Sequence, residues 1–180
     1  MVILKRNQNE NFIYSIPIEN FNSLFGNGGL LEASWGFRDR RIWNFTENDI
    51  AQITLHQSGK TRAIVRNGIN QWSLGTGSQG IINPPAIEET AHRFVELTAA
   101  GWVGRNITNP EQYGLNTNNL QIVFELKSGE KLSVEFGAEI PTAHTALATT
   151  MLDGERWAFV FPPVLFQSVL TYLTIPANVP

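Results

Sequence analysis

Alternation of apolar and polar residues with period two marks the clearest elements of the chain. It runs through Leu120–Leu126 and returns through Lys131–Phe136 after a turn at Ser128-Gly129. Successive side chains of a strand point to opposite faces, so each run has one apolar and one polar face. The pattern therefore predicts a half-buried β-hairpin.

A second pair of strands is predicted at 145–151 and 156–161. Asp153-Gly154 lies between them, and this dipeptide is typical of a two-residue hairpin turn, in which both residues need a positive φ. Pro162-Pro163 then opens a predicted helix through Leu173, because proline is tolerated in the first turn of a helix. The apolar side chains of this helix that could cover a sheet are Leu165, Phe166, Val169, Leu170 and Tyr172.

The middle of the chain repeats this alternation of strands and helix. Asp49–Gln57 and Lys60–Arg66 predict a hairpin across Ser58-Gly59, and Gln71–Leu74 predicts a short third strand. A helix follows, with Asn83 as its N-cap and prolines in its first turn. Its expected apolar face is Ile87, Ala91, Phe94, Val95 and Thr98, and its polar face is Glu88, Glu89, His92, Arg93 and Glu96. Gly101 is predicted to end this helix. Residues 106–119 are rich in asparagine and are predicted to form a long surface loop.

The N-terminal part resembles the end of such a unit. Phe12–Ile16 has weak strand character, Pro17 can start a helix, and Ile42–Phe45 returns to strand character. The sequence 16–24 also lines up with 161–169, including a helix-opening proline and a phenylalanine expected to be buried. We therefore predict an α+β fold of antiparallel meander or hairpin sheets, each covered by a helix, in a tandem-unit arrangement. Residues 1–45 would hold the C-terminal strand and helix of a preceding unit with its connector, and 46–180 one complete unit.

Composition narrows the class of protein. The 180 residues are 42% hydrophobic, enough for a core, and the net charge of −3 does not suggest a nucleic-acid-binding surface. No cysteine is present, so thiol catalysis, thiolate metal sites and disulfides are excluded. No run approaches the ~20 apolar residues that span a bilayer, and Met1–Leu4 is too short for the apolar core of a signal peptide. The chain as given is expected to be soluble, although it could be part of a longer, anchored protein.

Three patterns in the sequence are candidates for sites of chemistry. Residues 75–80 match G-x-G-x-x-G, but a dinucleotide loop needs the helix to begin within the motif, and here Ile81–Pro85 intervenes, which favours a turn. Glu88, His92 and Glu96 share a helical face, but a metal site would need ligands from a second element. His144 has no nucleophile motif beside it. We therefore expect no catalytic residue, no bound metal and no cofactor.

An interaction patch is the remaining candidate. Arg38-Asp39-Arg40-Arg41 is the densest charge cluster of the chain, and an internal ion-pair network is the alternative role for it. Among the five tryptophans, Trp35 and Trp102 lie in irregular, glycine-containing segments and are expected to be the most exposed. Core packing is the default for the others. The predicted patch is Arg38, Asp39, Arg40, Arg41, Trp35 and Trp102.

The order of these segments resembles the bacterial "domain of unknown function 4340" family over Phe12 to about Leu173. The similar segments are Tyr14–Leu24, Arg38–Arg41, Asp49-Ile50, Gln71–Leu74, a helix ending near Ala99, Tyr113–Leu115, a hairpin ending at Gly137, and Phe159–Pro162. Where the family continues with Asp and then Pro, this chain has Asn116-Thr117-Asn118. The resemblance implies tandem extracytoplasmic units, often encoded beside gliding-motility-type ABC transporter components, and implies no known activity.

The leading hypothesis is therefore a non-enzymatic structural or protein-interaction module of an extracytoplasmic, membrane-associated assembly. A glycan- or small-ligand-binding module is the alternative, and a hydrolase comes third. We expect protein partners, no nucleic acid and no membrane insertion by this chain. Residues 12–25 are expected to be required for solubility, and the chain to be a monomer or a swapped homodimer, since exchange of an identical element is a low-cost route to a dimer.

Overall fold

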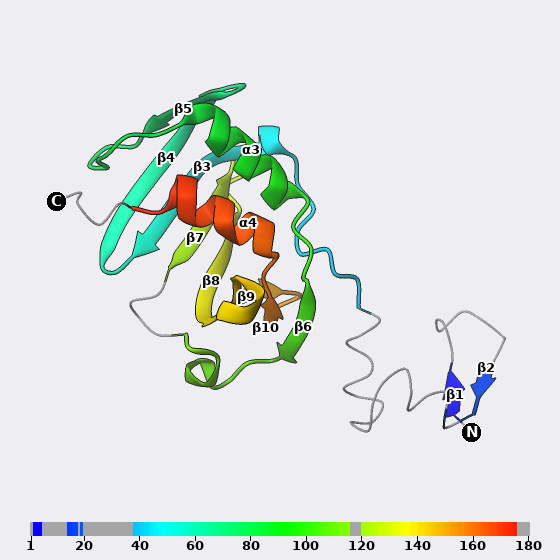
Figure 1. The fold of residues 1–180 in the computed structure, drawn as a ribbon. Coiled ribbons are helices and arrows are strands. Elements are labelled where there is room, and N and C mark those ends of the chain that lie inside the picture. The colour runs from blue at the N-terminus through cyan, green and yellow to red at the C-terminus, as the bar shows by residue number, and fades with distance from the viewer. Residues whose placement is uncertain (1, 5–13, 18, 20–37, 116–119, 176–180) are drawn as a thin grey trace. The chain divides into compact units, whose positions relative to one another are not determined.

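The computed structural model describes residues 2–4, 14–17, 19, 38–115 and 120–175, and the chain divides into two compact units, 1–39 and 40–180 (Figure 1). In the first unit, β1 (Val2–Leu4) and β2 (Tyr14–Ile16) form a two-stranded antiparallel sheet. This confirms the C-terminal end of the strand predicted at Phe12–Ile16. Apart from Glu19, the helix predicted after Pro17 lies outside the described residues, and so does Phe21, which was expected to be buried in it. Trp35 also lies outside the described residues.

Turn residues set the strand boundaries of the second unit, as predicted. Ser58 and Gly59 both have positive φ (51° and 78°) and join β3 (Ile50–Gln57) to β4 (Lys60–Gly68). Asp153 and Gly154 have nearly the same pair of angles (52° and 78°), and they join β9 (Thr145–Leu152) to β10 (Glu155–Val160). Positive φ at both turn positions matches the twist of the flanking strands. The remaining strands are β5 (Gln71–Leu74), β6 (Gly101–Arg105), β7 (Gln121–Leu126) and β8 (Lys131–Ile140).

The eight strands of this unit form one antiparallel sheet in the order β5-β4-β3-β7-β8-β9-β10-β6. The two hairpins predicted from the sequence meet at β3 and β7, where Ile53 lies opposite Phe124 and Leu55 opposite Ile122. The fold is thus mostly β with some helix. Within residues 40–180, the β3–β7 pairing joins the hairpins into one sheet, and two helices accompany it. The tandem-unit arrangement stays a prediction.

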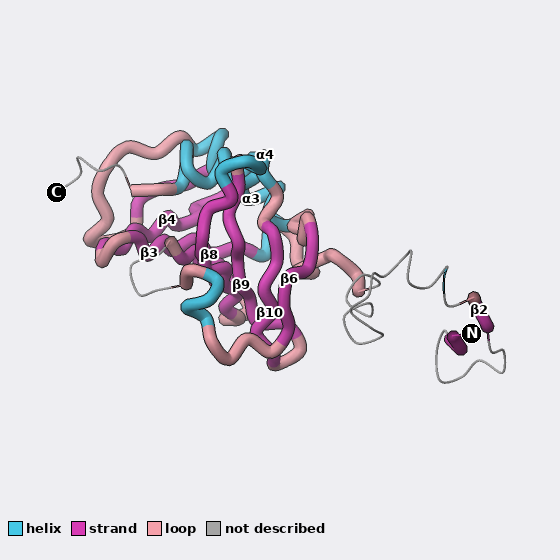
Figure 2. The backbone as a smooth tube through the Cα atoms, turned by 60° about the horizontal axis from the view of Figure 1, so that its bottom comes forward, coloured by secondary structure: helices cyan, strands magenta, loops and turns pink. Residues whose placement is uncertain are grey.

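Two helices lie together on one face of the sheet, as Figures 1 and 2 show. The first is α3 (Pro84–Val95), and the side chain of its N-cap Asn83 accepts a hydrogen bond from the Ala86 backbone N–H at 3.2 Å, as predicted. The second is α4 (Pro163–Ser168), which continues as the π-helical turn η4 (Val169–Leu173). The short 3-10 turns are η1 (Glu47–Asp49), η2 (Pro110–Tyr113) and η3 (Pro141–Ala143).

Aromatic side chains fill the space between helices and sheet. Phe94 of α3 packs on Phe124 of β7 with ring centroids 4.7 Å apart, and on Phe161 at 5.9 Å. All three are fully buried, and Phe166 of α4 is buried too, as predicted. Burying a phenylalanine contributes about 1.5–3 kcal/mol relative to leaving it in water, so this cluster is a main source of stability.

Two parts of this unit differ from the sequence-based expectation. Ile42–Phe45 is not a strand: only Arg41 makes a single antiparallel bridge, to Thr98, and the next residues enter the core instead. Trp43 stacks on Phe94 at 6.3 Å and meets Phe124 edge-on at 5.7 Å. Conversely, Gly101–Arg105 was expected to be irregular but forms edge strand β6, paired with β10.

The segment 106–115 packs closely on the sheet. The Tyr113 carbonyl oxygen would lie 2.1 Å from a Cβ atom placed on Gly137 of β8, and the Tyr113 hydroxyl 2.7 Å from one placed on Gly104 of β6. Glycine at both positions therefore allows this segment to approach the strands closely.

Candidate functional site: a polar groove along helix α3

The predicted interaction patch is only partly brought together. Arg40 and Arg41 are exposed, and the Arg40 Nη1 donates to the Ala100 carbonyl oxygen at 3.3 Å, directly before β6. Trp102 lies on β6 itself. Asp39 is exposed and Arg38 half-buried, and both belong to the first unit, so their place relative to β6 is not described. Trp35 lies outside the described residues.

Tryptophan packs inside the molecule at the positions the structure describes. Trp43, Trp72 and Trp157 are buried, whereas Trp102 is half-buried and meets Trp157 edge-on at 5.1 Å. Trp102 is thus the most exposed of these four tryptophans, as the sequence predicted. These rings contribute packing area and aromatic edge contacts to the fold.

Each histidine has separate surroundings. His56 Nδ1 lies 3.0 Å from the Thr61 hydroxyl across the β3–β4 hairpin, His92 bonds Glu47, and the His144 carbonyl accepts from Gln167 at 3.3 Å. Within the described ranges, no three His, Asp or Glu side chains come close enough together to hold a metal ion. The G-x-G-x-x-G stretch forms a turn before α3, with Gly77 and Gly80 at positive φ.

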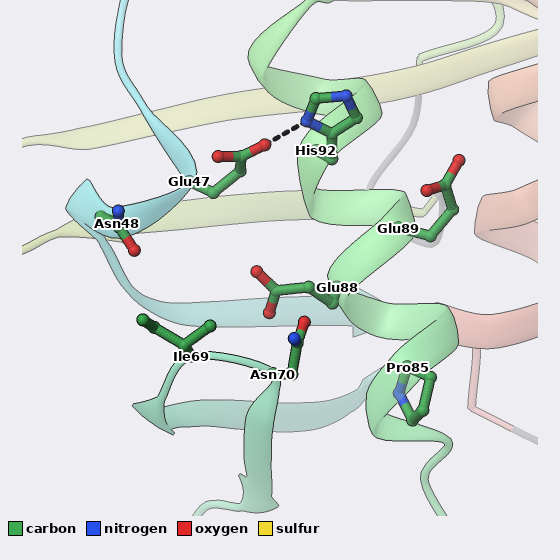
Figure 3. A pocket seen from close by; sticks show the side chains of 8 residues that line it. All are labelled: Glu47, Asn48, Ile69, Asn70, Pro85, Glu88, Glu89 and His92. Atoms are coloured by element: carbon green, nitrogen blue, oxygen red, sulfur yellow. Dashed lines mark hydrogen bonds and ion pairs between the residues drawn. The ribbon is translucent and has the colours of Figure 1, made fainter.

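A groove of about 580 Å³ runs beside the first turns of α3 (Figure 3). Three elements form its walls: η1, the turn between β4 and β5, and α3. Figure 3 shows Glu47, Glu88, Ile69 and Asn70 gathered on one side of the helix, whereas Glu89 points away from Glu47. The lining residues are Glu47, Asn48, Ile69, Asn70, Pro85, Glu88, Glu89 and His92.

The Glu88 carboxylate lies at the base of this groove and is bonded on both oxygens. The Arg66 Nη2 donates to one oxygen at 2.9 Å, and the Trp72 Nε1 donates to the other at 2.7 Å. The Arg66 guanidinium also lies 4.4 Å from the centre of the Trp72 ring, and its side chain is only 4% exposed. Two strands and the helix are thus joined by one buried cation, one carboxylate and one indole.

The other end of the groove is closed by Glu47 and His92. In η1, the Asp49 carboxylate accepts from the Thr46 backbone N–H and hydroxyl, both at 2.8 Å, in a capping-box arrangement that fixes Glu47 on the turn. The Glu47 carboxylate then meets the His92 Nδ1. This hydrogen bond raises the pKa of His92, and the negative charges of Glu47, Glu96 and Glu89 add to the effect.

Sequence reasoning found only the α3 side of this groove, through the polar helical face of Glu88, Glu89 and His92. It missed Glu47, Asn48, Ile69 and Asn70, which lie in two turns. The sequence Thr46-Glu47-Asn48-Asp49 does carry the capping-box pattern, and this signal could have placed Glu47 on a short helical turn. Nothing local indicates that this turn lies beside α3.

The ionisable side chains that line this groove are all engaged by another charged or titratable side chain. Each of its ionisable groups already has a partner of opposite charge: Glu47 with His92, Glu88 with Arg66, and Glu89 with Arg93 at 2.8 Å. Among the lining side chains outside these ion pairs, Asn48, Ile69, Asn70 and Pro85 are exposed to solvent, and Ile69 is 75% exposed. An exposed isoleucine between two amides can bury apolar area and form hydrogen bonds with a partner surface.

Neither α3 nor α4 has the length and apolar character needed to cross a membrane. No family model matches the chain, and comparisons with curated proteins and with solved structures find no similar one.

Proposed function

We propose that this protein is a non-enzymatic protein-interaction module that binds its partner across the groove beside α3. The observation that carries the proposal is the pairing of every ionisable group in the groove, which leaves Ile69, Asn48 and Asn70 for contact. The resemblance to tandem extracytoplasmic units supports a place in a membrane-associated assembly.

The pairing bears on catalysis because a general base must be free to take a proton from a substrate. Both oxygens of the Glu88 carboxylate already accept hydrogen bonds, one from a guanidinium and one from an indole. Its oxygens are also turned toward Arg66 and Trp72. The same contacts make the groove wall rigid, and a preorganised surface loses less entropy when a partner binds.

Ile69 is the residue to test, because it is exposed at the tip of the β4–β5 turn and its replacement leaves the core untouched. Ile69→Arg places a charge where the proposed partner contributes apolar area. Ile81→Arg is the matched control, since Ile81 is 93% exposed and lies in the loop before α3, outside the groove lining. Both variants should unfold at the wild-type temperature.

The experiment is chemical cross-linking in cells that naturally produce the protein, followed by purification of the tagged full chain and mass spectrometry. The expected result is a set of partners held by the wild type and by Ile81→Arg and lost by Ile69→Arg. Equal recovery by all three would show that the groove is not the binding surface, and substrate turnover by the purified chain would show that the protein is an enzyme.

A further inference from the structure

The contact between Glu47 and His92 joins two elements that are 45 positions apart in the chain. Glu47 lies on η1, directly before β3, and His92 lies on α3, one turn beyond Glu88. Both side chains are partly solvent-exposed, Glu47 by 33% and His92 by 49%, so protons from solvent reach them. Figure 3 shows this contact at the end of the groove opposite Pro85.

The charges around His92 are almost all negative. On α3 they are Glu88 and Glu89, with Arg93 as a cation, and Glu96 is the C-cap residue of the helix. On η1 they are Glu47 and Asp49. The nearby cations are committed elsewhere: Arg93 to Glu89, and Arg66 to Glu88. Among the other elements that contact α3, β5, α4 and η4 contain no charged residue, whereas β4 contributes Arg66, which is bonded to Glu88. Lys127 is a further cation beside η1, where its charge adds to the Thr46 hydrogen bonds that lower the pKa of Asp49. A protonated imidazole at His92 meets the Glu47 carboxylate on η1.

We propose that Glu47 and His92 form a proton-controlled latch that holds η1 against α3 and so sets the opening of the groove. When His92 carries its second proton, the contact is a charge-assisted hydrogen bond, and such bonds are about twice as strong as neutral ones. When His92 is neutral, the charge is lost and η1 is held more weakly. The latch does not depend on the proposed partner, but its consequence for binding at the groove rests on the proposed function.

The sign of the effect follows from the raised pKa of His92 in the folded protein. The latch is fully closed below the ordinary pKa of histidine. It weakens as the pH rises through the higher pKa that His92 has in the folded chain. Acid therefore closes the groove end and mild base releases it.

The test uses the full chain and nuclear magnetic resonance. The pKa of His92 is measured in the wild type, in Glu47→Gln and in Glu89→Gln, which removes one carboxylate from α3 without touching η1. Glu47→Gln should lower the pKa of His92 toward its ordinary value, and Glu89→Gln should lower it less. An equal decrease in both variants would mean that the imidazole responds to general negative charge, and the latch would be disproved.

A second measurement reports on η1 directly. The Asp49 backbone N–H donates to the Thr46 carbonyl oxygen at 3.0 Å, so its protection from hydrogen exchange, corrected for the intrinsic pH dependence, follows the stability of this turn. In the wild type this protection should fall about two- to five-fold as His92 loses its proton, the range expected for an exposed ion pair. In Glu47→Gln it should stay constant, and the same fall in that variant would overturn the proposal even if the pKa shifts as expected.

Discussion

A single carboxylate joins helix α3 to the edge of the sheet. Glu88 accepts from Arg66 of β4 and from Trp72 of β5, and Arg66 is shielded from water by the Trp72 ring. The Arg66 Nε and Nη1 have no hydrogen-bond partner among the described residues, so the Nη2 contact with Glu88 is what compensates the buried charge. A buried cation that loses its only counter-ion is strongly destabilising.

The first prediction concerns this carboxylate. Glu88→Ala should lower the free energy of unfolding by about 3 kcal/mol, because it leaves Arg66 and the Trp72 N–H unpaired. Urea unfolding followed by circular dichroism measures the change. Glu89→Ala is the matched control on the same helix, and it should change stability by less than about 0.5 kcal/mol because its ion pair with Arg93 is exposed. Similar losses in the two variants would contradict the role given to Glu88.

A second prediction concerns acid stability through Asp49. The hydrogen bond from the Thr46 backbone N–H, followed by that from the Thr46 hydroxyl, lowers the pKa of Asp49. A carboxyl group with a depressed pKa stabilises the fold above its ordinary pKa, and this contribution disappears as the pH falls through the lower folded value.

Asp49→Asn should therefore flatten the acid side of the curve of melting temperature against pH. The wild type and the variant should differ least at the lowest pH and most near neutrality. A constant difference between wild type and Asp49→Asn at every pH would show that the proton on Asp49 is not involved.

At the scale of elements, close approach of chain segments decides which residues are tolerated. Gly137→Ala would place a Cβ atom 2.1 Å from the Tyr113 carbonyl oxygen, and that oxygen belongs to backbone that cannot simply rotate away. The expected cost is about 1–3 kcal/mol, the range for overpacked sites. Gly101→Ala on β6 is the control, because a Cβ there meets no atom within 4 Å. Thermal unfolding should separate the two, and a harmless Gly137→Ala would show that 106–115 does not pack on β8 as described.

Elements held by local signals were the ones that the sequence predicted well. The Ser58-Gly59 and Asp153-Gly154 turns fix their hairpins through φ alone, and Asn83 caps α3 with its own side chain. β6 was missed because its five residues include two glycines and show no alternation, and its partner β10 lies about fifty residues further along the chain. Ile42–Phe45 was wrongly predicted as a strand, since an apolar run does not reveal whether it pairs with a strand or fills a core.

The groove illustrates the same limit. The helical wall of the groove can be predicted from the periodicity of α3. Ile69 and Asn70 line the groove only because β5 folds back on β4, and Glu47 lines it only because η1 lies directly before β3. The pairing of β3 with β7 is equally non-local, joining residues such as Leu55 and Ile122. Loop-closure entropy and packing decide these contacts, and no single stretch of sequence encodes them.

At the scale of the whole molecule, the last prediction concerns where the sheet-forming unit begins. The chain divides at 39/40, and Ile42, Trp43 and Phe45 lie in the same core as Phe94 and Phe124. The eight-stranded sheet is complete within 40–180. A chain that begins at Arg40 should therefore fold by itself, with a single cooperative unfolding transition.

A chain that begins at Thr46 lacks Ile42, Trp43 and Phe45 and provides the sharp comparison. Each of these side chains is at least 92% buried, and removing all three should cost several kcal/mol, since each buried large apolar side chain contributes about 1.5–3 kcal/mol. The chain that begins at Thr46 also loses two backbone hydrogen bonds. The Ile42 N–H donates to the Leu97 carbonyl oxygen at 2.9 Å, and the Ala99 N–H donates to the Arg40 carbonyl oxygen at 2.8 Å. Urea unfolding of the two chains measures the difference. Equal stability would show that 46–180 is the complete unit, as the sequence suggested.

Light scattering on the chain that begins at Arg40 tests the separate expectation that residues 12–25 are needed for solubility. A monomer that stays in solution would show that this expectation is wrong.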